Sequence, residues 1–155
     1  MSIDRELIGN ALLAQITSAY SFARFGRRFF TYSAGGPYPS LFQRDGDEDT
    51  LRPQQGPRGL LPVQIFTYEV WVYAPQVGAD TPPASSLNPL VSAVELALEP
   101  GPRGEVITLG GLVQHAWIEG KTIKDTGEYS KQPTAMIPVS VKVIANSQNR
   151  WTAPA

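Results

Sequence analysis

The residue types that could carry chemistry in this chain are few, and the most suggestive group is an acidic run. Its members are Asp45, Asp47, Glu48 and Asp49. The three aspartates stand at alternate positions, as the first ligands of a calcium-binding loop do. The rest of such a loop does not follow, because Thr50 replaces the turn glycine and Gly56 the bidentate glutamate. We therefore predict a solvated or partner-facing acidic patch and no metal site.

The single histidine offers no better basis for catalysis. His115 has no cysteine, second histidine or G-x-S-x-G sequence to work with, so neither a zinc site nor a base with its nucleophile can be assembled. Residues 120–122, Gly-Lys-Thr, resemble the end of a phosphate-binding loop, but His115 stands in place of its first glycine. We predict a hairpin turn there, with His115 and Trp117 packed or at an interface. We expect no catalytic residue, metal or cofactor, and hence no enzyme.

Arginines and phenylalanines alternate between residues 22 and 30. The arginines are Arg24, Arg27 and Arg28, and the aromatic residues are Phe22, Phe25, Phe29 and Phe30. This mixture is typical of a small nucleic-acid-binding platform. Arginines at a helix end also interact favourably with the negative end of the helix dipole, and this is the interpretation we favour. Contact of these arginines with another protein or with passing DNA remains open.

Composition predicts one domain spanning residues 1–155. The chain has 42% hydrophobic residues, and a chain of this length buries about two thirds of its unfolded surface. Thirteen Lys and Arg against fourteen Asp and Glu give a net charge of -1, which would gather neither DNA nor an anionic membrane. The start of the chain is charged where a signal peptide is apolar. We therefore expect a soluble protein without a membrane partner, made in the cytoplasm of its host.

The first elements expected along the chain are a helix and two short strands. Apolar residues at helical spacing, Ile8, Leu12 and Ile16, predict a helix from residue 3 to about residue 25, with Ser2 as its cap. Strands are predicted at residues 27–33 and 40–44. Residues 45–62 contain four acids, three prolines and three glycines. Such a segment cannot bury enough apolar surface to offset ordering, so we predict a long loop there.

The second half of the chain alternates strands with one helix. Residues 63–74 predict a strand with Phe66 on its core face and with Trp71 and Tyr73 on the opposite face. A helix is predicted from Asn88, as its cap, to residue 98. Residues 109–120 and 132–143 are predicted to be two long strands. The segment 146–155 is expected to be loosely ordered apart from Trp151.

The order of these elements resembles that of the tail terminator proteins of long-tailed bacteriophages. The resemblance rests on the first helix, the arginine-rich strand start, residues 38–42 before a polar loop, the strand 66–74, the helix after Asn88-Pro89, and the strands at 109–113 and 137–139. It implies an α/β domain of the α+β type, in which two main helices pack on a mixed, mainly antiparallel sheet. It also implies a homo-hexameric ring that ends the tail tube on its head-proximal side.

That resemblance implies partners and a location. The partners are the tail tube protein and a head-tail connector or other neck protein, and the location is the virion, with DNA passing through the ring without sequence-specific binding. A closed ring needs head-to-tail contacts and exposed aromatic residues. The candidate interface comprises Arg24, Arg27, Arg28, Asp45, Asp47, Glu48, Asp49, Trp71, Tyr73, His115 and Trp117. Replacing Trp71 or the Arg27-Arg28 pair is expected to weaken assembly more than folding.

Two other function classes stay open. Another neck ring component, such as a connector or gateway protein, would share this composition and differ in its partner. A small ligand-binding domain or enzyme would need a pocket with converging polar groups, and none can be assembled from the sequence.

Overall fold

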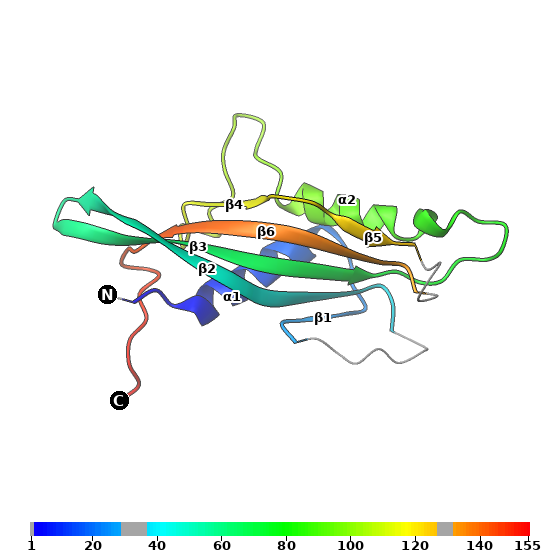
Figure 1. Cartoon of the computed structure of the whole chain (residues 1–155), viewed down its shortest axis with the longest axis horizontal. Coiled ribbons are helices and arrows are strands. Elements are labelled where there is room, and N and C mark those ends of the chain that lie inside the picture. Colours follow the sequence, from blue (N-terminus) through cyan, green and yellow to red (C-terminus); the bar gives the residue numbers. More distant parts are fainter. Residues whose placement is uncertain (1, 29–36, 127–131) are drawn as a thin grey trace.

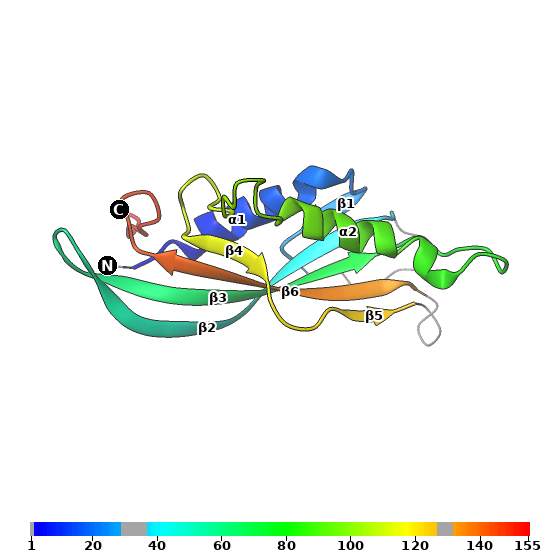
Figure 2. The same ribbon diagram turned by 90° about the horizontal axis from the view of Figure 1, so that it is seen from above.

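A computed structural model describes residues 2–28, 37–126 and 132–155, and these residues form a sheet with two helices on one face (Figures 1 and 2). The helices are α1 (Arg5–Ile16) and α2 (Asn88–Ala97), with short 3-10 turns at Thr17–Ala19 and Pro83–Ser85. The strands are β1 (Arg24–Gly26), β2 (Ser40–Gly56), β3 (Gly59–Tyr73), β4 (His115–Ile118), β5 (Ile123–Asp125) and β6 (Thr134–Ile144).

The strand order in the described residues is β1-β2-β3-β6-β4, with β5 also paired to β6. β1 is parallel to β2, and the remaining pairs are antiparallel. This confirms the predicted α+β class with a mixed, mainly antiparallel sheet. The core lies between the sheet and the helices. Its most buried members include Phe66, Tyr68, Val70 and Val72 of β3, Ile137, Val139 and Val141 of β6, Ile8, Leu12 and Ile16 of α1, and Leu90 and Val94 of α2.

The first helix is shorter than predicted. Asp4, and not Ser2, caps α1, because its Oδ1 accepts a hydrogen bond from the Leu7 amide at 3.1 Å. After Ile16 the hydroxyl of Thr17 donates to the Leu13 carbonyl at 2.8 Å, and such side-chain bonds compete with helix continuation. The backbone at Tyr20 is extended. The second helix is confirmed, although Asn88 is its first residue and not its cap.

The long loop predicted for residues 45–62 is wrong, because this segment is the outer part of a β-hairpin. β2 runs to Gly56, β3 begins at Gly59, and the two pair antiparallel along their length. Gly59 has a φ of 117°, a conformation that glycine adopts readily. The register shifts between Asp45 and Glu48 and between Leu51 and Gln54. At such bulges one strand holds extra residues while pairing continues on either side. The side chains are exposed as expected, but the backbone ladder orders them.

Two predictions for the C-terminal third are also corrected. The strand predicted over residues 109–120 is confined to β4, because Leu109, Gly110 and Gly111 all have positive φ and form a turn. The start of this tail is anchored by backbone pairing, because Arg150 bridges to Ile3 and the Trp151 amide donates to the Ser2 carbonyl at 2.9 Å, whereas the Trp151 side chain is 50% exposed. Asn149 is fully buried and donates to the carbonyls of Leu112 and Ile144.

The strand predicted for residues 27–33 lies largely outside the described residues, since residues 29–36 are not among them. The strand that pairs with Ser40 and its neighbours is β1, at residues 24–26. No helix in the described part of the chain is long and apolar enough to cross a membrane.

Candidate interaction surfaces

Arg27 is held inside the monomer by a polar cluster. Its Nη1 donates to Glu6 Oε2 at 3.0 Å and to Asn10 Oδ1 at 3.2 Å, and its Nη2 donates to Asp45 Oδ2 at 2.9 Å. The side chain is only 17% exposed. Burial lowers the pKa of this guanidinium, but the hydrogen bonds and charges of Asp45 and Glu6 outweigh it, so the pKa is raised overall. Arg27 therefore links α1 to β2.

A second ion pair fastens the acidic run to the start of the same helix. Arg5 pairs with Glu48 through two bonds, Nε to Oε1 at 2.6 Å and Nη2 to Oε2 at 2.9 Å. The Arg5 guanidinium also lies 5.3 Å from the centre of the Phe66 ring. All four predicted acids are exposed, but Asp45 and Glu48 form ion pairs with Arg27 and Arg5, whereas Asp47 and Asp49 form no ion pair with another described residue. Within the described ranges no group of three metal-ligating side chains occurs.

The sheet face opposite the helices carries the predicted aromatic residues. Trp71 and Met136 are directly opposite in register, as are Met136 and Ile123, so the three form a row across β3, β6 and β5. Trp71 and Tyr73 are half-buried and line a shallow depression of about 380 Å³ on this face. Burial raises the pKa of the Tyr73 hydroxyl. Both helices lie on the other side of the sheet (Figure 2).

His115 and Trp117 share that open face at the β4 edge of the sheet. Their rings stack with centres 4.8 Å apart and planes 15° apart. The Trp117 Nε1 donates to Glu119 Oε2 at 3.1 Å. His115 Nδ1 is buried and makes no hydrogen bond within the described part of the chain. The interpretation of His115 as a packed residue fits this geometry.

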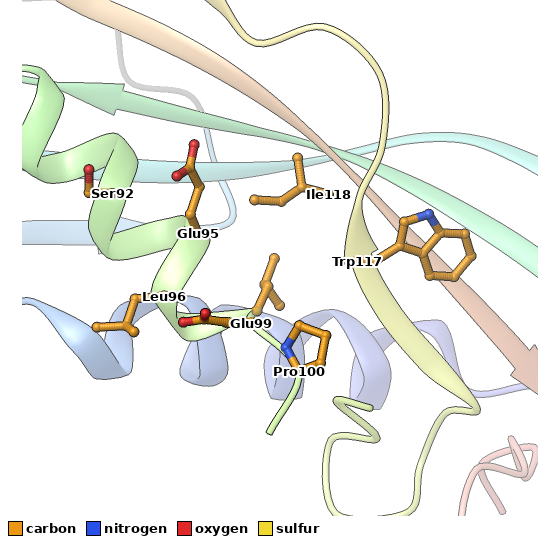
Figure 3. Close-up of a pocket in the computed structure, with 8 residues that line it drawn as sticks. Ser92, Glu95, Leu96, Glu99, Pro100, Trp117 and Ile118 are labelled. Atoms are coloured by element: carbon orange, nitrogen blue, oxygen red, sulfur yellow. The ribbon is translucent and has the colours of Figure 1, made fainter. Parts of the chain in front are cut away.

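A groove of about 600 Å³ runs between the end of α2 and β4 (Figure 3). We call it the α2–β4 groove. Its lining includes Glu95, Leu96, Glu99 and Pro100 from the helix side and Trp117 and Ile118 from β4. Leu96 is 62% exposed. Sequence reasoning missed this groove, although Leu96 was a signal, since it is an apolar residue outside the buried stripe of its helix.

The outer end of the β2–β3 hairpin projects beyond the core (Figure 1). The last pair between β3 and β6 is Val63 with Ile144, so the β2–β3 pairs outward of Leu51–Val63 have no third strand beside them in the described sheet. We call residues 51–62 the arm. It exposes two leucines, Leu51 at 37% and Leu60 at 66%. The sequence does not reveal the arm either, because its polar, proline-containing composition predicts a loop.

The predicted interface residues therefore do not form one patch. Arg27, Asp45 and Glu48 join α1 to the hairpin base, while Trp71 and Tyr73 lie together on the open face. His115 and Trp117 lie at the β4 edge of that face. Of the other members, Asp47 and Asp49 are exposed on β2, Arg24 is in β1, opposite Ser40, and Arg28 is exposed after it.

The packing of Arg27 against α1 predicts an unusual response at Gly9. A glycine-to-alanine change inside a helix normally stabilises it by about 1 kcal/mol. At Gly9 the new Cβ would lie 2.5 Å from Arg27 Cζ and displace the guanidinium. We expect Gly9→Ala to give no gain in the wild-type chain and a gain of about 1 kcal/mol in an Arg27→Ala background. Urea unfolding of the four proteins checks this, and equal gains in both backgrounds would contradict it.

Comparison with known proteins gives a distant structural likeness. No family model matches the sequence, and no curated protein matches it. Among solved structures, the chain is similar to a chain from the virion of a native gene transfer agent particle, with 16% identity and a TM-score of 0.38. The match covers 86% of this chain and 84% of that one.

Proposed function

We propose that this chain is a structural virion protein of a phage or phage-like particle, and specifically a tail terminator. In this proposal six copies form a ring on the head-proximal end of the tail tube, stop its polymerisation and dock to the connector or neck. The chain is not an enzyme and takes no cofactor. DNA crosses the ring without sequence-specific contacts.

The observation that carries the proposal is the arm. A two-stranded ribbon is marginally stable in water by itself, so a partner surface that covers the arm and its exposed leucines would stabilise it. The arm lies at one end of the molecule, whereas the α2–β4 groove and the open sheet face lie elsewhere (Figures 1 and 2). Different surfaces at different places on one chain suit head-to-tail contacts, which close into rings. The resemblance of the element order to that of tail terminators is the reason to propose that this ring is a tail terminator.

The electrostatics of the described residues also support this proposal over a nucleic-acid-binding role. Of the three arginines in the predicted basic platform, Arg27 is neutralised by Asp45 and Glu6. A net charge of -1 gives little counterion release on DNA. A lumen that conducts DNA must not hold it tightly, so this weak attraction suits the proposed role.

Removing the gene from its particle tests the proposal. Without a terminator, tube polymerisation has no stop, so we expect tails of uncontrolled length that fail to join heads. Electron microscopy of the particles measures both features. Tails of normal length that do not join heads would favour another neck component, and normal tails on full heads would refute a role at this junction.

A further inference from the structure

We propose that the arm of one copy binds in the α2–β4 groove of the next copy, and that this contact builds the ring. The inference rests on the proposed function and adds the contact that makes the ring. The two surfaces are chemically matched, and the arm extends away from the body of its own chain (Figures 1 and 2).

The arm presents apolar and basic groups together. Its residues 51–62 contain two arginines, Arg52 and Arg58, and no acid. Both arginines are exposed, and neither forms an ion pair with another described residue. Leu60 lies two residues from Arg58 and is the most exposed large apolar side chain in the described part of the molecule, at 66%. The arm therefore carries an apolar anchor with one arginine two residues away and a second arginine on the paired strand.

The groove presents the complementary set. Leu96, Pro100 and Ile118 give it an apolar wall, and Leu96 is 62% exposed. Its charged lining residues are Glu95 and Glu99, with no cation among the residues that line it. Neither glutamate forms an ion pair within the described residues. An exposed leucine on an arm that carries two arginines fits this surface better than a neutral or acidic segment would, because opposite charges at the rim favour the correct partner.

The position of the two surfaces makes the contact intermolecular. Both views place the tip of the arm at one end of the long axis of the molecule, whereas the C-terminal end of α2 and β4, which form the groove, lie nearer the middle (Figures 1 and 2). The arm points away from its own groove. A contact between unlike surfaces of identical chains is heterologous, and it propagates from copy to copy until a ring closes.

Cysteine cross-linking tests the contact directly, because the chain has no cysteine of its own. A Leu60→Cys variant mixed with a Leu96→Cys variant should give a disulfide-linked dimer under mild oxidation. The double variant should give a ladder of linked species that ends at the ring. The matched control pairs Leu60→Cys with Leu7→Cys, which is exposed on α1 at 40% and should not link. Linkage with Leu7→Cys as strong as with Leu96→Cys, or no linkage in assembled particles, would overturn the inference.

Charge reversal gives a second measurement that does not depend on cysteine. We expect the Arg52→Glu/Arg58→Glu variant and the Glu95→Lys/Glu99→Lys variant each to weaken self-association about tenfold. Combining all four changes should restore most of the lost association, as sedimentation velocity would show. Arg103→Glu, an exposed change outside the arm, is the control and should have little effect. No restoration in the combined variant would refute the pairing, while tail-length control in the particle would still test the terminator role separately.

Discussion

Replacing Arg27 with alanine should destabilise the isolated monomer by about 2 kcal/mol, because hydrogen bonds to charged groups contribute roughly 1.5–3 kcal/mol and the buried stem packs on α1. The guanidinium bridges α1 to β2 through Glu6, Asn10 and Asp45. Both carboxylates are half-exposed or more and can be rehydrated, which keeps the loss from being larger. For a chain of this size we expect a fall in Tm of about 4–8 °C.

The neighbouring arginine provides the control for this result. Arg28 is exposed and has no hydrogen bond to another described residue, so Arg28→Ala should change the unfolding free energy by less than about 0.5 kcal/mol. Urea unfolding of dilute monomer separates the two variants from any effect on assembly. This revises the sequence-based expectation that the Arg27-Arg28 pair affects assembly more than folding. An Arg27→Ala monomer of unchanged stability would restore that expectation.

The predictable parts of the fold are those in which buried side chains recur at the spacing of the element, every second residue in a strand or every third to fourth residue in a helix. Val70 and Val72 alternate with Trp71 and Tyr73 along β3, and the structure places the first pair in the core and the second on the opposite face. The helix from Asn88 carries apolar residues at helical spacing and begins with proline in its first turn. In both elements, local sequence and tertiary burial favour the same structure.

The outer hairpin, which includes the arm, could not be predicted in this way, because its side chains are exposed and their burial does not fix its structure. Residues 45–56 are nearly all exposed, and what holds them in β2 is the backbone ladder to β3. A polar segment with prolines has the composition of a loop, and composition carries no information about a partner strand. The bulges at Asp45/Glu48 and Leu51/Gln54 further disguise the strand, since they break its two-residue period.

The sequence indicated several residues that make specific contacts, but it did not indicate what those contacts are. Arg27 and Asp45 were both predicted as interface residues, and the structure shows that they pair with each other at 2.9 Å. Pairing between residues far apart in sequence follows from topology, which residue types alone do not specify. The sequence does not predict the α2–β4 groove for the same reason, because Leu96 and Ile118 line one groove only after α2 is placed beside β4.

Removing the arm should abolish assembly while leaving the monomer folded. The variant replaces residues 52–62 with Asn-Gly, so that a two-residue type I′ turn joins Leu51 to Val63, which already face each other in register. No arm residue belongs to the core cluster. The carbonyl of Pro62 accepts a hydrogen bond from the Ala145 amide at 3.0 Å, and the glycine carbonyl at that place can accept it instead. We expect a change in unfolding free energy below about 1 kcal/mol and loss of detectable rings.

A second variant serves as the control, because it changes the arm but keeps the side chains proposed to contact the groove. Gln54→Ser with Gln55→Ser changes two exposed arm residues but keeps Leu60, Arg52 and Arg58, and it should assemble like the wild-type chain. Sedimentation velocity of the three proteins, with tail lengths in particles that carry each gene, measures both consequences. Rings formed by the truncated chain would show that the arm is not the subunit contact. Since the truncation removes only the outermost strand pairs, loss of rings from a folded monomer would locate the contact in the arm itself.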